Sequence, residues 1–381
     1  SETGHPGSRV RPDERRHVKS LVVVGTLAEM GGAERQALYL VEHLAGLSGS
    51  VVEILAFEDG EALRPRLDAL GVKVHVIPYY FRWPRARRAR ALARLAAMLR
   101  FQIQPDALLP FVGVHSKTIG LVWPYSGAKF CWWNQQDEGR DLGGTSAERR
   151  ILQNVSCIIS NSVAGRDFLA GTYGLERESI LVYNNGTPVP VLKSVPQTWT
   201  AMPDLRGRQI VTMIANVTSY KDHSTLLHAW VLVKRHFDGR TLPALLLAGH
   251  LHEAKTVSHL KLTAFDLGLS SDDVRFLGTV SDVDSLILAS DLIVHSSVTE
   301  GCPNAVCEAM SFARPVVATD IPGCRQALGD ASAAWLAAPG DPAALAAAIM
   351  RALEDDTLRA EAGCRNRRRI EESFSIAAMN R

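Results

Sequence analysis

Two carboxylates and a helix start lie close together near residue 300. Glu300 and Glu308 are separated by seven residues, and they follow an apolar run, 292–296, that predicts a strand. Pro303 or Asn304 suits the start of a helix, so unpaired N–H groups of its first turn would face a phosphate or a sugar hydroxyl. Glu308, about one turn inside that helix, is suited to accept hydrogen bonds from a ribose diol, and Glu300 to meet sugar hydroxyls. The bare spacing also fits a structural role, in which Glu308 stabilises the helix N-terminus.

The elements that would position this loop alternate between apolar runs and amphipathic segments. In the first half we expect strands at 20–25, 51–57, 72–77, 107–111, 130–133 and 157–160, and helices at 34–47 and 85–99. In the second half we expect strands at 210–215, 244–248, 274–277, 292–296 and 316–318, and helices at 223–235, 255–267, 285–289, 305–312 and 343–353. Such alternation predicts parallel sheets with helices on both faces.

The pattern breaks over residues 183–200, which are rich in Asn, Gly and Pro and carry no clear period. We place a linker there, between a domain at 18–190 and a second at 200–365. The expected fold is therefore α/β, with two Rossmann-like domains whose sheets turn their carboxyl ends, where such folds bind ligands, onto one cleft.

Composition narrows the class of protein. The 381 residues are 46% hydrophobic and carry 42 basic against 40 acidic side chains, which argues against a nucleic-acid footprint over the whole surface. The six cysteines form no CxxC pair, residues 1–17 read as a disordered lead-in, and no apolar run reaches the roughly 18 residues that span a bilayer. We expect a cytoplasmic protein that can also lie on a membrane surface.

The whole segment around residue 300 is more specific than its spacing. Glu300-Gly301-Cys302-Pro303-Asn304, Glu308-Ala309-Met310 and the following 313–320 closely resemble the donor motif of retaining glycosyltransferases of family 4, which have the GT-B fold. By that resemblance Glu300 and Glu308 are the family's E-x7-E pair, and Gly301, Cys302, Pro303 and Asn304 belong to the donor-binding loop. The resemblance also suggests that residues 366–381 form a C-terminal helix that crosses back toward the first domain.

Two other segments resemble the family's diphosphate-binding loops. Gly31, Gly32 and Glu34 follow the first strand and match a glycine-rich loop in which backbone amides approach the donor. Lys221 matches the lysine that neutralises charge on the leaving group. The family's arginine, five residues earlier, is replaced by Asn216, which can donate one hydrogen bond but cannot form a bidentate phosphate clamp.

In the first domain the resemblance is weaker. Relatives often carry a histidine beside the reacting sugar after the strand at 130–133, where this chain has Asn-Gln-Gln-Asp. Gln135 and Asp137 are candidates to orient the donor sugar or the acceptor. His115, one element earlier, fits either a site wall or a structural residue.

A basic segment precedes these residues. Between 69 and 105 there are eight basic residues and no acidic one, and aromatic residues including Trp83 stand just before the predicted helix. Arg87, Arg90 and Arg94 cluster on one face of that helix, and Arg85 lies at its start. This patch fits either a solvated helix face or a site for anionic lipid headgroups or a phosphate-bearing acceptor.

The sequence therefore predicts a retaining hexosyltransferase of glycan biosynthesis. It would use a nucleoside diphosphate sugar, UDP-sugar before GDP-mannose, and a glycan, lipid-linked or small-molecule acceptor, with no cofactor, no metal and no nucleic acid. Glu300, Lys221, His115, Gln135 and Asp137 are the candidate catalytic residues. The alternatives are a nucleotide-sugar epimerase or hydrolase on the same fold, and a non-catalytic glycan- or nucleotide-binding protein, for which Asn216 is the best argument.

Overall fold

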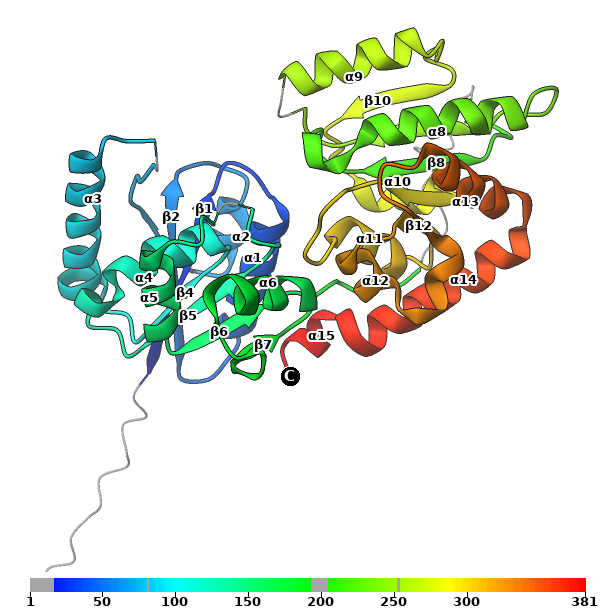
Figure 1. Ribbon diagram of the computed structural model, residues 1–381. Helices are drawn as coiled ribbons and strands as arrows, with labels where there is room; N and C mark the ends of the chain where they lie inside the picture. The colour runs from blue at the N-terminus through cyan, green and yellow to red at the C-terminus, as the bar shows by residue number, and fades with distance from the viewer. Residues whose placement is uncertain (1–16, 81, 141, 193–204, 252–253) are drawn as a thin grey trace, which may run out of the picture. The chain divides into compact units, whose positions relative to one another are not determined.

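The computed structural model describes residues 17–80, 82–140, 142–192, 205–251 and 254–381. The predicted lead-in, except His17, residues 193–200 of the predicted linker and residues 201–204 of the predicted second domain lie outside the described residues. The described chain forms two parallel sheets with helices on their faces, so both predicted Rossmann-like domains are confirmed (Figure 1).

The first sheet has seven strands in the order β3-β2-β1-β4-β5-β6-β7. Their bounds are β1 Val18–Thr26, β2 Ser50–Glu58, β3 Lys73–Val76, β4 Ala107–Pro110, β5 Phe130–Gln135, β6 Cys157–Ser160 and β7 Ile180–Val182. The helices are α1 Gly32–Ala45, α2 Arg64–Ala69, α3 Arg85–Met98, α4 Gly113–Ser126, α5 Ser146–Asn154 and α6 Val163–Tyr173. Apolar side chains of α1 and α2, including Leu38, Val41 and Leu67, pack against β1 and β2 and bury one face of these strands.

The second sheet has six strands in the order β10-β9-β8-β11-β12-β13. The strands are β8 Ile210–Ile214, β9 Ala244–Ala248, β10 Val274–Gly278, β11 Leu292–His295, β12 Val316–Thr319 and β13 Leu336–Ala337. The helices are α8 His223–His236, α9 Ala254–Asp266, α10 Val283–Ala289, α11 Asn304–Ser311, α12 Pro322–Leu328, α13 Pro342–Glu354, α14 Asp356–Arg369 and α15 Ile376–Met379.

Strand β9 shows how both faces of the second sheet are covered. Leu245 and Leu247 join the core formed with α8, α9 and α13, whereas Leu246 packs with Leu286 of α10. Successive side chains of a strand point to opposite faces, so a strand buried on both sides must be apolar throughout. This explains why the run 244–248 is uninterrupted in the sequence.

The chain divides into two compact units at a point that differs from the predicted linker. One unit holds the residues up to Phe111 together with Lys117–Trp132, and the other holds Val112–Ser116 and Trp133–Arg381. The division therefore runs through β5 of the first sheet.

The C-terminal segment is also arranged differently from the prediction. The expected start at residue 366 falls inside α14, because Asp355 caps that helix earlier by accepting a hydrogen bond from the Leu358 N–H at 2.8 Å. After a π-helical turn over Ile370–Phe374, Ser375 forms a parallel bridge with Thr187, directly before α15.

Candidate functional site

The candidate site lies where the strand order of the second sheet reverses, between β8 and β11. Strands β8 and β11 are neighbours, but β8 continues through α8 to β9 on one side and β11 continues through α11 to β12 on the other. The loops that leave these two strands therefore diverge at the carboxyl edge of the sheet. In open α/β sheets this divergence creates the crevice in which ligands bind.

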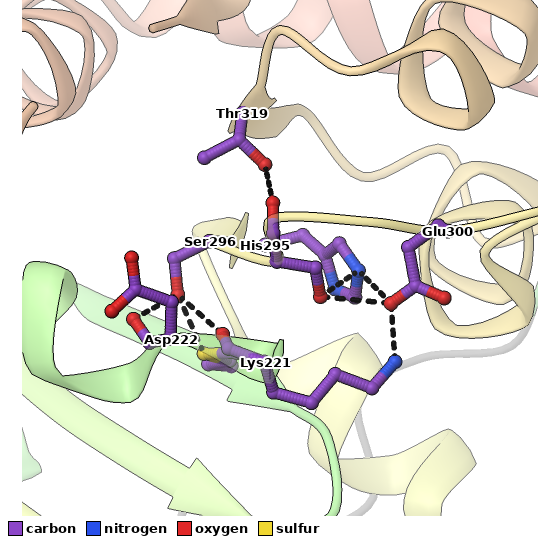
Figure 2. Close-up of polar contacts among 8 residues, drawn as sticks. Lys221, Asp222, His295, Ser296, Glu300 and Thr319 are labelled. Atoms are coloured by element: carbon purple, nitrogen blue, oxygen red, sulfur yellow. Dashed lines mark hydrogen bonds and ion pairs between the residues drawn. The ribbon is translucent and has the colours of Figure 1, made fainter. Parts of the chain in front are cut away.

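Lys221 and Glu300 come together across that divergence. The Lys221 ammonium forms an ion pair with Oε1 of Glu300, and both side chains are largely buried. His295, the last residue of β11, places its Nε2 3.0 Å from the same oxygen, and the Ser297 hydroxyl donates to it at 2.8 Å. Figure 2 shows the lysine and the imidazole reaching this carboxylate from different sides.

All the contacts that the described residues make with Glu300 go to Oε1. A carboxylate accepts hydrogen bonds at both of its oxygens. The carboxylate is thus fixed through one oxygen, and Oε2 remains as an acceptor for a hydroxyl group.

The cluster has a defined charge at neutral pH. Burial alone would raise the pKa of Glu300, but the charge of Lys221 and the hydrogen bond from His295 outweigh it and lower the pKa. Burial lowers the pKa of His295, and the contact with Glu300 only partly opposes this. Glu300 is therefore ionised and His295 is neutral, so Lys221 and Glu300 balance each other.

Small polar contacts hold the two loops in place. The Ser296 hydroxyl lies 3.1 Å from the Lys221 carbonyl oxygen and 3.0 Å from that of Asp222, which ties the end of β11 to the loop after β8 (Figure 2). Thr319, at the end of β12, donates from Oγ1 to the Ser297 carbonyl. These roles could not be predicted from the sequence, because isolated Ser and Thr residues are common at strand ends.

Helix α11 begins as predicted. Pro303 is the N-cap and Asn304 the first helical residue, and no side chain of the described residues caps this end. Its first-turn N–H groups are therefore directed out of the helix, where an anion is favoured. Glu308 is the fifth residue of α11 and half-buried, while Gly301 and Cys302 are buried in the loop before it.

Asn216 does not reproduce the phosphate clamp of an arginine. It is exposed, and its Oδ1 accepts a hydrogen bond from the His250 N–H at 3.0 Å. Its side chain thereby links the loop after β8 to the loop after β9.

The glycine-rich segment lies at the start of α1. Gly31 is the N-cap and Gly32 the first residue of the helix. A Cβ on Gly31 would lie 2.6 Å from Oε2 of Glu34, so the glutamate side chain folds back over the helix start. Burial raises the pKa of this carboxyl group, and the nearby Glu29 adds to the effect.

Gln135 and Asp137 hydrogen-bond to each other at the end of β5. The Gln135 amide donates to Oδ1 of Asp137 at 2.7 Å, and the same oxygen accepts from the Gly139 N–H at 2.7 Å. Gln135 is fully buried and also accepts from the Trp133 indole at 3.1 Å. These contacts fix the shape of the loop after β5. His115 lies half-buried in the first turn of α4.

Two family models match the two halves of the chain. Residues 30–189 match the model "Glycosyltransferase Family 4", and residues 208–355 match "Glycosyl transferases group 1". The chain belongs to the family 4 glycosyltransferases of the GT-B fold. The segments from which the sequence predicted this family, at 31–34, 216–223 and 299–320, all fall within the matched regions.

Among curated members of this family, the chain is 31% identical over 178 residues to a phosphatidyl-myo-inositol mannosyltransferase of Mycobacterium leprae, a match that covers 46% of this chain and 44% of that protein. It is 22% identical to a D-inositol 3-phosphate glycosyltransferase of Corynebacterium diphtheriae, over 57% of this chain and 52% of that protein. The chain thus spans about half the length of the curated relatives it matches.

Solved glycosyltransferases share the fold over nearly the whole chain. HepE from Anabaena, solved in complex with UDP and glucose, superposes with a TM-score of 0.81 at 20% identity, covering 96% of this chain and 97% of HepE. WaaG, a glycosyltransferase involved in lipopolysaccharide biosynthesis, superposes with a TM-score of 0.72 at 16% identity, covering 94% and 97%.

The basic patch of the sequence lies on α3. Arg85, Arg87, Arg90 and Arg94 are exposed, and the Arg87 guanidinium stacks 3.9 Å from the centre of the Trp83 ring. Leu95, by contrast, is buried on the inner face of the helix. No helix among the described residues is both long and apolar enough to cross a membrane.

An Asp-x-Asp spacing, a pattern that can hold a metal ion, is present at Asp282 and Asp284. Asp282 is the N-cap of α10, where its carboxylate accepts from the Ser285 N–H at 3.0 Å. Within the described ranges, no group of three or more His, Cys, Asp or Glu residues is arranged to hold a metal ion.

Proposed function

We propose that the chain transfers a sugar from a nucleoside diphosphate sugar to an acceptor, with retention of anomeric configuration. The observation that carries this proposal is the Lys221–Glu300 pair at the carboxyl edge of β8 and β11, next to the uncapped start of α11. The pair offers a cation to a diphosphate and a free carboxylate oxygen to the sugar, side by side. Such a pair suits a ligand that is anionic at one end and rich in hydroxyls at the other.

The donor groups are divided among three parts of the site. Lys221 meets the diphosphate, Oε2 of Glu300 and the loop amides around Gly301 meet the sugar, and Glu308 accepts hydrogen bonds from the ribose diol. UDP-sugar is the favoured donor and GDP-mannose the next, and the shared fold of HepE, whose structure contains UDP and glucose, supports the first choice.

The reaction breaks the bond between the anomeric carbon and the diphosphate oxygen. The acceptor oxygen forms the new bond on the same face, and its proton passes to an oxygen of the leaving phosphate. Lys221 and the N-terminal amides of α11 stabilise the charge that grows on the leaving group. No carboxylate is assigned as a nucleophile under the anomeric carbon, so front-face attack is the preferred route. Since these groups fill the role of a cation, we expect turnover to persist in a chelator.

The acceptor is proposed to be glycan, lipid-linked or small, and the chain to act at a membrane surface. The support is the exposed arginine row of α3 with its stacked Trp83, which suits anionic headgroups. The relatives' names also mention phosphorylated inositol compounds. Sedimentation with vesicles containing anionic lipid should fall when Arg87, Arg90 and Arg94 are changed to Gln. Equal binding of wild type and variant would remove the membrane assignment.

The proposal is tested by following donor and acceptor together. We expect NMR to show that a nucleotide sugar is consumed only when an acceptor is present, and that the product keeps the donor's anomeric configuration. Donor consumption without acceptor would instead indicate an epimerase or hydrolase. Binding of the donor without any turnover would indicate a non-catalytic protein, the alternative that Asn216 favours.

A further inference from the structure

A pocket of about 370 Å³ opens between the N-terminal parts of α8 and α9. Thr218, Asp222 and His223 line one side, from the loop after β8 and the first turn of α8. Lys255 and His259 line the other side, from α9. The volume lies within the roughly 300 to 1,000 Å³ typical of small-molecule sites. Lys221, Glu300 and Glu308, the residues proposed for the donor, do not line it.

Two buried polar atoms belong to residues of this pocket and have no partner among the described residues. They are Nδ1 of His223 and Oγ1 of Thr218. His223 is only 4% exposed. A buried polar atom without a hydrogen bond is costly, and native proteins retain few of them without a ligand, a water or a functional reason. Both atoms are covered by the wall of the pocket, so a hydroxyl group of a ligand reaches them through a side-chain rotation.

The His223 imidazole is prepared to accept a hydrogen bond. Burial lowers its pKa to about 4, so the ring is neutral at physiological pH, and a hydrogen bond with the backbone of Ala215 acts in the opposite direction. Its Nδ1 has no hydrogen-bond partner among the described residues, and an unprotonated Nδ1 accepts a hydrogen bond. A hydroxyl group is the complementary ligand.

The opposite wall carries an ammonium group and an imidazole. Lys255 and His259 stand four residues apart on α9, so they share one face of the helix, and both are exposed. The carboxylate on the rim, Asp222, is already engaged, because it accepts from the Thr225 N–H at 3.2 Å and from its hydroxyl at 2.6 Å. The pocket thus offers polar groups at one wall, and the ammonium group of Lys255 and the imidazole of His259 at the other.

We propose that this pocket is a second ligand site, which binds a phosphorylated sugar or polyol. The phosphate lies against Lys255 and His259, and a hydroxyl donates to Nδ1 of His223 beside Thr218. The site is distinct from the proposed donor site. A ligand in this pocket can nevertheless affect the donor site. Thr218 and Asp222 line the pocket and belong to the same loop as Lys221, which pairs with Glu300.

Calorimetric titration of the full chain, with no nucleotide present, tests the proposal. Glucose 6-phosphate should bind saturably, inorganic phosphate more weakly, and glucose not at all. The K255Q/H259Q double variant should lose at least ten-fold in affinity for both phosphates, whereas K261Q, a matched change elsewhere on α9, should bind as wild type. T218V should weaken glucose 6-phosphate several-fold and leave inorganic phosphate unchanged.

Two results would overturn the second site. They are no saturable binding of glucose 6-phosphate at millimolar concentration, and equal binding by wild type and K255Q/H259Q. A parallel titration with vesicles containing phosphatidylinositol 4-phosphate distinguishes a lipid headgroup from a soluble ligand of the same chemistry. None of these readouts depends on sugar transfer, so the second site and the proposed function can fail separately.

Discussion

At the scale of single residues, Glu300 and Lys221 satisfy each other in the absence of a donor. Their ion pair lies largely out of water, where removing one partner leaves an uncompensated buried charge. When a diphosphate binds, it takes over the lysine, and Glu300 stays fixed through His295 and Ser297 at 3.0 and 2.8 Å. The pair is therefore charge-balanced before the donor binds, and donor binding transfers the lysine charge from Glu300 to the diphosphate.

The Lys221–Glu300 ion pair should make single and double variants differ in their free energy of unfolding. K221M should lower the free energy of unfolding by about 3 to 5 kcal/mol, because it leaves the Glu300 carboxylate buried and unpaired. The double variant K221M/E300Q should recover most of that loss, since neither charge remains. Urea unfolding at pH 7 measures both. Equal destabilisation of the single and double variants would show that the charge balance is not what matters.

Replacing Glu308 should lower the affinity for nucleotides that carry a ribose diol. A hydrogen bond to a charged group contributes about 1.5 to 3 kcal/mol, so E308A should weaken UDP binding by roughly 10- to 150-fold. The same variant should bind 2′,3′-dideoxy-UDP about as well as wild type does, because the diol is absent. Isothermal titration with both nucleotides is the measurement. An E308A chain that binds UDP normally would contradict the ribose assignment.

At the scale of elements, α12 packs through Gly323 against the backbone of the loop at Glu300 and Gly301. A Cβ at this position would lie 2.3 Å from the Gly301 carbonyl oxygen and 2.5 Å from that of Glu300, both of them backbone atoms. The loop can therefore approach α12 only where a side chain is absent. This packing fixes the position of the Glu300 backbone relative to α12.

Replacing Gly323 tests this support. G323A should cost about 1 to 3 kcal/mol of stability through overpacking and should weaken donor binding, because the loop must shift. G171A is a matched control in α6, where an added Cβ meets nothing within 4 Å and alanine should stabilise the helix slightly. Thermal unfolding and donor titration check both. Normal donor affinity in G323A would show that the loop position is not set by α12.

The sequence predicted correctly those strands that form distinct apolar runs. The run 244–248 matches β9, because a strand buried on both faces is apolar throughout, and the run 157–160 matches β6. The short strands β7 and β13 and the helices α5 and α12 were not predicted. Helix α5 begins with a capping box between Thr145 and Glu148, a pattern that is visible in the sequence.

The residues of the candidate site also differ in how far the sequence predicts them. Glu300, Pro303 and Lys221 were predicted because they belong to a specific motif, and the structure places Lys221 against Glu300. His295, by contrast, looks in the sequence like the last residue of an apolar strand. Its contact with Glu300 depends on how the chain turns after β11, a three-dimensional property that spacing does not encode.

At the scale of the whole molecule, two buried neutral histidines predict sensitivity to acid. The pKa of His223 falls from 6.5 to about 4 and that of His295 is also lowered, in both cases chiefly through burial. An unfolded chain would take up these protons first, so their stabilising effect is complete above pH 6.5 and is lost as the pH falls. For His223 the total is about 3 kcal/mol, at 1.36 kcal/mol per pKa unit. Glu300, whose pKa is also lowered, adds a loss only below pH 4.5.

Urea unfolding at pH 7 and pH 5 measures this loss. H223Q should lose less stability between the two pH values than wild type, because it has no proton to take up there. H228Q, a change at an exposed position of α8, should follow wild type. If H223Q and wild type lose the same amount, His223 is not a source of the acid sensitivity.

The central claim is that a nucleoside diphosphate sugar binds at the loops after β8 and β11. Thermal unfolding with a panel of UDP-, GDP-, ADP- and dTDP-sugars tests it most directly, because a ligand at one hundred times its Kd stabilises the folded chain by about 2.7 kcal/mol. We predict that one class of nucleotide sugar, UDP-sugars first, raises the Tm of the wild type and that E308A loses most of this rise. A panel in which no nucleotide sugar raises the Tm, or in which E308A responds as the wild type does, would contradict the account.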